Sequence, residues 1–121
     1  MSDRQPTIAV DVDGVLAEYD GWKGPGVVGK PREDVVTALR ILRGEGWKIV
    51  IHTTRSELEI MSWLEQHNIA YDEVNRNSAY QNSGSKPVAT VYWDDRAVRY
   101  SGDGMKDLGE IRGFRTWAGR E

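Results

Sequence analysis

Two carboxylates, Asp11 and Asp13, lie on either side of one valine, directly after a short apolar run and just before Gly14. Like charges this close raise each other's proton affinity, so the pair costs stability unless a cation or a reaction uses it. Where the chain turns at the glycine, both carboxylates can approach one phosphoryl group. A carboxylate in such a place can attack phosphorus and form an aspartyl-phosphate.

Further groups suited to a phosphate site follow other apolar runs of the chain. They are hydroxyls, an ammonium group and a second acidic pair: Thr53 with Thr54, Lys86, and Asp94 with Asp95. Carboxylates are hard oxygen ligands that suit Mg²⁺, whereas a hydroxyl and an ammonium group can hold phosphoryl oxygens. Each group alone has an ordinary structural explanation as a strand former, a loop lysine or a helix cap. The complete set in this order predicts a magnesium-dependent phosphoryl site.

Alternating strands and helices must bring these groups together. Strands are expected at 7–11, 47–55, 71–74 and 89–93, with a last edge strand at 113–117, and helices at 32–44, 56–68 and 105–111. Strands that alternate with helices form right-handed βαβ units and a mostly parallel sheet. Ligands gather at the carboxyl ends of such strands. The candidate groups are therefore expected to face one rim of the sheet.

Two local patterns shape the chain around this rim. Residues 18–31 are rich in glycine and contain two prolines, which predicts a shaped loop rather than a linker. Ser56 and Glu59 have the spacing of a capping box, in which the serine and the glutamate bond to each other's backbone N–H. This pair predicts the start of the second helix.

Composition indicates one compact domain spanning residues 1–121. The net charge is −3, there is no cysteine, and no apolar stretch approaches the roughly 20 residues that span a bilayer. We therefore expect a cytoplasmic protein without a membrane partner, and the acidic balance gives no sign of a nucleic-acid footprint.

Two other acidic sites are excluded by residue type and order. A calcium hand needs a third Asp or Asn where Val15 stands, and a helix rather than a strand before the loop. A response-regulator receiver places its acidic pair before the phosphoacceptor and has none after the lysine, which is the opposite of the order here.

The segments "DVDG" (11–14), "IVIHTTR" (49–55) and "VYWDDR" (91–96), together with Lys86, resemble the haloacid dehalogenase superfamily of phosphotransferases. The resemblance extends over residues 7–117, and its departure is Val15, where many members have threonine. It implies a three-layer α/β Rossmannoid fold whose mostly parallel sheet has the strand order 3-2-1-4-5.

The resemblance also implies roles for the candidate residues. Asp11 is the nucleophile and Asp13 the general acid and base, while Thr53 and Lys86 hold the phosphoryl oxygens. Asp94, with Asp95, completes the Mg²⁺ site formed by Asp11 and the backbone carbonyl of Asp13. Whether Thr53 or Thr54 supplies the hydroxyl stays open, with Thr53 favoured as the first hydroxyl after the apolar run.

The spacing of these motifs leaves no room for a cap domain. The gaps from Asp11 to Thr53 and from Thr53 to Lys86 are 42 and 33 residues, and the expected helices and strands fill most of both. The remaining cover is the 18–31 loop, so Tyr19 and Trp22 are candidate substrate-binding residues together with Thr54 and Arg55. Trp22 has two interpretations, of which packing against the sheet edge is slightly favoured over leaning across the rim.

The sequence thus predicts a capless, Mg²⁺-dependent phosphomonoester hydrolase that acts through an aspartyl-phosphate on a phosphorylated small molecule. One alternative is a nucleic-acid 3′-end phosphatase, because such enzymes share the DVDG start, the DDR motif and a late segment comparable to "GFRTW" (113–117). A catalytically silent binding module of the same fold is the other. Capless members act on large substrates or complete their site by oligomerising, so a homo-oligomer is a further expectation.

Overall fold

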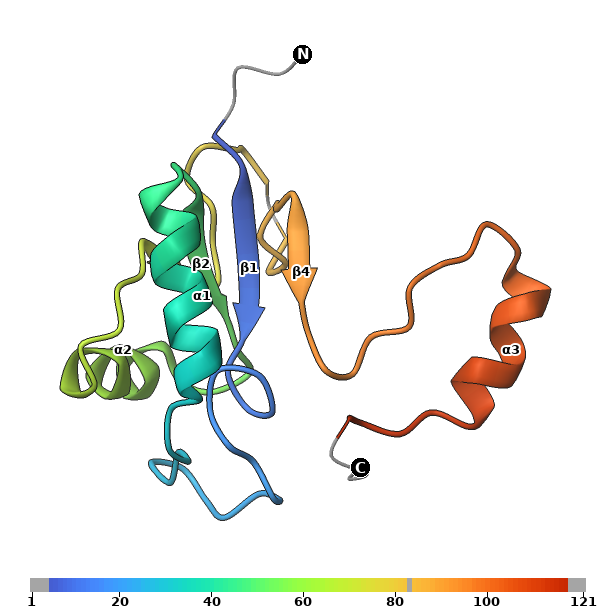
Figure 1. Cartoon of the computed structure of the whole chain (residues 1–121), viewed down its shortest axis with the longest axis horizontal. Helices are drawn as coiled ribbons and strands as arrows, with labels where there is room; N and C mark the ends of the chain where they lie inside the picture. The colour runs from blue at the N-terminus through green and yellow to red at the C-terminus, as the bar shows by residue number, and fades with distance from the viewer. Residues whose placement is uncertain (1–4, 83, 118–121) are drawn as a thin grey trace.

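A parallel four-stranded sheet forms the centre of the protein (Figure 1). The computed structural model describes residues 5–82 and 84–117. The strands are β1 (Thr7–Asp11), β2 (Lys48–His52), β3 (Glu73–Val74) and β4 (Val91–Trp93), in the spatial order β3-β2-β1-β4. Because every neighbouring pair is parallel, the carboxyl ends of all four strands lie at one edge. This is the arrangement of a small Rossmann-like α/β fold.

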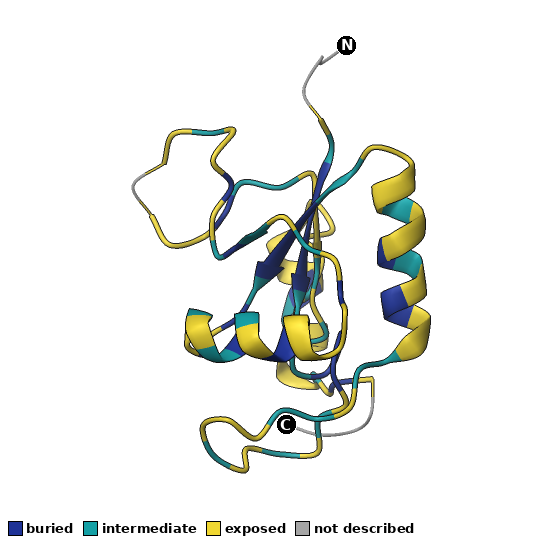
Figure 2. Cartoon of the chain, turned by 90° about the vertical axis from the view of Figure 1, so that its left-hand side faces the viewer, coloured by how far each residue is buried: buried dark blue, intermediate teal, exposed yellow. Residues whose placement is uncertain are grey.

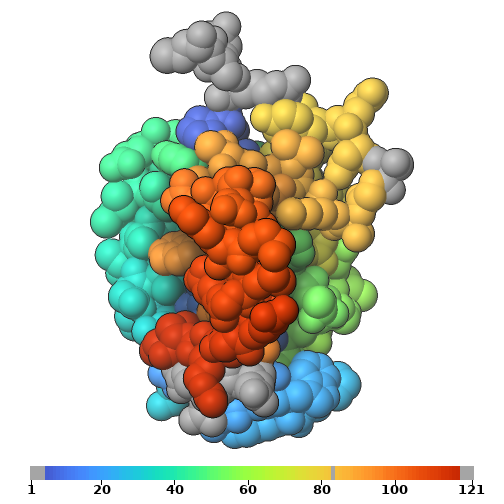
Figure 3. All heavy atoms as spheres, turned by 90° about the vertical axis from the view of Figure 1, so that its right-hand side faces the viewer, coloured from blue at the N-terminus to red at the C-terminus, as the bar shows by residue number. Residues whose placement is uncertain are grey.

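Three helices accompany the sheet: α1 (Glu33–Gly44), α2 (Glu57–Gln66) and α3 (Gly104–Arg112). The first two bury apolar side chains, among them Leu39 of α1 and Ile60 of α2, whereas the buried residue of α3 is Asp107. Accordingly, α3 stands off the sheet beyond β4 (Figures 1 and 3). In the part of the chain that the structure describes, no helix is both long and apolar enough to cross a membrane.

The hydrophobic core lies along the two central strands. Val10 in β1 and Ile49 and Ile51 in β2 are fully buried, together with Leu16 from the turn that follows β1. Truncating such a side chain to alanine costs about 2–5 kcal/mol, so β1 and β2 are the rigid elements of the fold. The sequence correctly predicted these strands as apolar runs, although β2 ends at His52 and leaves 53–55 in a turn.

Two expectations about the sheet are wrong. Within the described residues the sheet ends at β4, and 113–117 form no fifth strand. An edge strand needs backbone pairing with β4, whereas the end of this segment is held elsewhere, through a 2.8 Å hydrogen bond from the Trp117 indole to the Gly14 carbonyl. The expected strand order 3-2-1-4-5 is accordingly wrong in its last position, because the observed order among the described residues is β3-β2-β1-β4. Figure 2 shows buried central strands beside helices whose residues are mostly exposed. The expectation of an α/β fold with a parallel sheet is therefore confirmed, but not its fifth strand.

The capping box is wrong as well, although α2 begins where it predicts. Ser56 precedes the first helical residue, but its side chain makes no capping hydrogen bond to any described residue. The Glu59 carboxylate accepts instead from the backbone N–H of Gly26 and pairs with Arg55 at 3.5 Å. A tertiary contact has therefore replaced the local one.

Candidate active site

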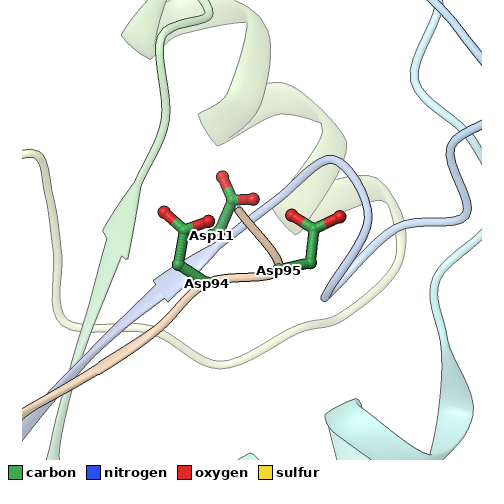
Figure 4. A group of neighbouring side chains, drawn as sticks. All are labelled: Asp11, Asp94 and Asp95. Carbon is green, nitrogen blue, oxygen red and sulfur yellow. The ribbon is translucent and has the colours of Figure 1, made fainter. Parts of the chain in front are cut away.

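Three carboxylates meet at the carboxyl edge of the sheet. Asp11 is the last residue of β1, and Asp94 and Asp95 follow β4 directly. Val10 pairs with Trp93 in the parallel register, so the next residue on each strand, Asp11 and Asp94, emerges at the same level. One carboxylate oxygen from each of the three aspartates lies within 4.8 Å of the others (Figure 4).

The electrostatics of this aspartate cluster oppose its full ionisation. Burial, followed by the charges of Asp94 and Asp95, raises the pKa of Asp11 from 3.8 to about 8. Burial and the charge of Asp94 also raise the pKa of Asp95. Two neighbouring aspartates with raised pKa values make this edge of the sheet the candidate site of the protein.

The aspartate cluster fits a hard divalent cation. All its donors are carboxylate oxygens, and Oδ1 of Asp95 is buried without a hydrogen-bond partner among the described residues. Gly14 has a φ of +91°, and a Cβ there would collide with the Asp95 carboxylate, so the absence of a side chain lets the turn close around it. Oxygen donors, a buried orphan acceptor and a tight turn suit a cation such as Mg²⁺ or Ca²⁺.

The Asp13 carboxylate binds Arg55 and is not part of the aspartate cluster. The ion pair is bidentate, with Arg55 Nε to Oδ2 at 2.8 Å and Nη2 to Oδ1 at 3.1 Å. The Arg55 side chain is 2% exposed, and the hydrogen bond with Asp13 is the main cause that raises the pKa of Arg55. Sequence reasoning placed Arg55 against the substrate, but its guanidinium is directed at protein carboxylates.

Thr53 is the better placed of the two hydroxyls. It is buried, and its Oγ1 accepts a hydrogen bond of 3.0 Å from the backbone N–H of Arg55. A hydroxyl that accepts this bond can still donate its own proton. Its backbone is fixed by Asn75, whose side-chain oxygen accepts from the Thr53 N–H at 2.9 Å and whose amide donates to the Thr53 carbonyl at 3.0 Å. Thr54 is exposed and has no comparable support.

A cavity of ≈ 250 Å³ brings most of the predicted residues together. Its lining includes Asp11, Asp13, Tyr19, Trp22, Thr53, Thr54 and Asp94. Lys86 lies outside this cavity and lines a neighbouring one of ≈ 230 Å³, which shares Asp11 and Asp94 with the first. The Lys86 ammonium rests 4.4 Å from the centre of the Tyr92 ring. Thr53 and Lys86 therefore line two different cavities, and Asp11 and Asp94 line both.

Trp22 lies over the site and not in the core. It is 59% exposed, lines the cavity of Asp11, and its ring centre is 4.7 Å from the guanidinium carbon of Arg55. The interpretation of Trp22 as a residue packed on the sheet edge is therefore wrong. A loop whose backbone is set by glycines at positive φ can present an indole to solvent without a core contact, and Gly21 at +122° is next to it.

Sequence reasoning missed three residues that shape the site. Asn75 holds Thr53, Glu59 reaches the 18–31 loop, and Trp117 bonds to the carbonyl of Gly14. Asn75 carried a usable signal, since it is a polar residue directly after the expected strand at 71–74. Its φ of +57° in the structure is one that asparagine adopts more readily than most residues. The other two contacts join segments far apart in sequence and had no local signature.

Comparisons with known proteins support the fold. No family model matches the chain, and no curated protein matches it significantly. A conserved protein of Bacteroides thetaiotaomicron is similar in structure, with a TM-score of 0.63 and 22% identity over 96% of this chain and 97% of that one. A structure from Vibrio cholerae has a TM-score of 0.51 and 30% identity over 88% of this chain and 94% of that one. At this identity and coverage, the chain belongs to the same family as the Vibrio cholerae protein.

Proposed function

We propose that the protein is a Mg²⁺-dependent phosphomonoester hydrolase of the haloacid dehalogenase type. The observation that carries the proposal is the aspartate cluster of Asp11, Asp94 and Asp95, two of which line one cavity with the buried Thr53. When bound there, Mg²⁺ would supply positive charge that stabilises the ionised carboxylates and the phosphoryl oxygens.

Asp11 is the nucleophile in this proposal. Its carboxylate oxygen forms a bond to phosphorus while the bond to the leaving oxygen breaks, which gives an aspartyl-phosphate and an alcohol. The raised pKa of Asp11 keeps it protonated near neutral pH in the absence of a cation. Positive charge at the aspartate cluster would favour the ionised form of the nucleophile.

Asp13 moves the proton. It takes a proton from the water that attacks the aspartyl-phosphate, and it delivers that proton to the leaving oxygen in the next turnover. The ion pair with Arg55, at 2.8 and 3.1 Å, holds the Asp13 carboxylate in a fixed position for this role. The products of one cycle are the alcohol and inorganic phosphate.

Thr53 and Lys86 orient the phosphoryl group from two sides of Asp11. The Thr53 hydroxyl donates to one phosphoryl oxygen, because that oxygen can only accept, while Thr53 Oγ1 itself accepts from the Arg55 N–H. The Lys86 ammonium supplies charge from the adjoining cavity, in which it shares Asp11 with the first. Donors fixed before the reaction stabilise the charge that develops on phosphorus.

A 3′-phosphorylated nucleic-acid end is the second candidate substrate. A further cavity of ≈ 500 Å³ shares Tyr19 with the cavity of Asp11 and is lined by Lys23, Lys30, Arg32 and Trp117, with Glu18 and Asp20 as opposing charges. Cations beside an indole are the groups that hold a nucleotide's phosphate and base. A small phosphorylated metabolite would leave this cavity unused.

Two assays test the function and the substrate class. Purified protein should hydrolyse an aryl phosphate with added Mg²⁺ and lose this activity with a chelator or with Asp11→Asn. A protein that is inert with and without Mg²⁺ would favour the silent binding module. Parallel assays of phosphorylated metabolites and 3′-phosphorylated oligonucleotides then identify the substrate class by kcat/KM.

A further inference from the structure

The 18–31 loop is closed at its base by its own backbone. The Glu18 N–H donates to the Lys30 carbonyl at 2.8 Å, and the Arg32 N–H donates to the Leu16 carbonyl at 2.7 Å. Gly29 lies so close to the Glu18 carbonyl that a Cβ there would collide with it. These contacts fix where the loop leaves and rejoins the fold, but residues 19–27 form no strand and have no backbone hydrogen-bond ladder.

The tip of the loop is held by two side chains at the start of α2. Arg55 Nη2 donates to the Val27 carbonyl at 3.0 Å, and Glu59 accepts from the Gly26 N–H. The Arg55 guanidinium also lies against the ring of Trp22, with 4.7 Å to the ring centre. The two side chains that do this are themselves paired, Nη1 to Oε2 at 3.5 Å.

Arg55 is also held by two carboxylates that lie outside the loop. Its side chain is 2% exposed, and its charge is balanced by Asp13 at 2.8 Å and by Glu59, whose side chain is 16% exposed. A buried cation that loses a partner carries a large desolvation penalty, so the guanidinium stays where both carboxylates reach it. The same planar group therefore touches the candidate proton carrier and the tip of the loop.

We propose that Arg55 and Glu59 form a positioning pair that holds the tip of the 18–31 loop, and Trp22 with it, beside Asp11. The consequence for catalysis rests on the proposed phosphatase function, whereas the anchoring of the loop does not. The proposed reaction gives Glu59 no chemical role, and Glu59 belongs to none of the motifs that resemble the haloacid dehalogenase superfamily. Its role follows from the contacts with Gly26 and Arg55.

The first test measures how often the tip of the loop opens and does not depend on enzymatic activity. Lys23-Gly24 in the tip is a trypsin site, and its cleavage in folded protein reports how often the tip opens. Glu59→Ala should accelerate this cleavage about tenfold, the effect of losing a hydrogen bond to a charged group. Glu59→Gln keeps an acceptor for the Gly26 N–H and should restore most of the protection. Glu65→Ala, an exposed carboxylate change on the same helix, is the matched control.

The second test links the loop to the site. In steady-state assays, Glu59→Ala should lower kcat/KM for an aryl phosphate several-fold and Glu59→Gln should recover it, while Glu65→Ala stays at the parental value. Unchanged cleavage at Lys23 in both Glu59 variants would overturn the anchor. Faster cleavage with unchanged kcat/KM would overturn the positioning role. If the parent protein has no phosphatase activity, faster cleavage supports the anchor while the proposed function fails.

Discussion

Replacing Asp11 with asparagine is predicted to stabilise the cation-free protein. The substitution keeps the shape of the side chain and removes one charge from the aspartate cluster. Burial, Asp94 and Asp95 raise the pKa of Asp11 from 3.8 to about 8. Each pKa unit is worth about 1.4 kcal/mol, so this difference corresponds to roughly 6 kcal/mol before solvent screening is counted. Because Asp11 is only partly buried, we expect about half of that, roughly 2–3 kcal/mol.

The sign and the pH window follow from the direction of the pKa change. At a pH below the ordinary value of 3.8, the Asp11 carboxyl is neutral in both folded and unfolded chains. As pH rises further, the unfolded chain releases its proton while the folded one holds it until about pH 8. The folded state therefore binds more protons in this window, so the free energy of unfolding falls with rising pH and levels off above it. Asp11→Asn lacks this contribution.

Urea denaturation with a chelator at pH 5 and pH 8 checks this prediction. At pH 8 the variant should unfold at a urea concentration about 1–2 M higher than the parent, and the difference should shrink at pH 5. Glu65→Gln, an exposed change of the same charge, should follow the parent at both values. Adding Mg²⁺ at pH 8 should stabilise the parent more than the variant. A parent whose stability matches that of Asp11→Asn at pH 8 would refute the electrostatic reasoning.

Three further substitutions separate the roles of the site residues. Gly14→Ala introduces a Cβ at a φ of +91° against the Asp95 carboxylate and should cost about 1–3 kcal/mol of stability. Titration calorimetry should also show weaker Mg²⁺ binding, and parental affinity would contradict the tight turn. Trp22→Ala should lower kcat/KM but, at 59% exposure, should cost about 1 kcal/mol or less instead of the 3–5 kcal/mol of a buried indole. Normal kinetics in a destabilised Trp22→Ala would contradict this. Asp13→Asn keeps an acceptor for Arg55 and should slow alkyl phosphates at least about tenfold more than aryl phosphates, because a basic leaving oxygen needs the proton. Equal losses in kcat for both substrates would remove Asp13 from that role.

The parts of the fold that could be predicted are those set by local sequence. An uninterrupted apolar run before Asp11 indicates a buried central strand, and the same reading of 89–93 places Asp94 at the end of another. Because both strands are parallel neighbours, the two carboxylates had to emerge at one edge. The proximity of Asp11, Asp94 and Asp95 could therefore be predicted, because these residues follow two strands expected in one parallel sheet.

The parts that could not be predicted depend on contacts between distant segments. Glu59 lies 33 residues from Gly26, and Arg55 lies 42 residues from Asp13. The local sequence pattern predicted a capping hydrogen bond between Glu59 and the start of its own helix. In the structure the Glu59 carboxylate pairs with the buried Arg55 instead. The 113–117 segment has the composition of a strand, yet its tryptophan bonds to a carbonyl in the turn after β1. Tertiary packing decides between such alternative contacts, and it produces no periodic pattern in the sequence from which they could be predicted.

Trapping a covalent phosphoenzyme tests the central claim most directly. Protein mixed with Mg²⁺ and a phosphomonoester is quenched in acid within a turnover. ³H-labelled borohydride then reduces the acyl phosphate to tritiated homoserine with release of phosphate, and the tritium label is located by peptide mapping. The account predicts label on the peptide that contains Asp11, none with Asp11→Asn, and none when a chelator replaces Mg²⁺. Turnover of substrate with no label on Asp11, or with label retained in Asp11→Asn, would contradict it.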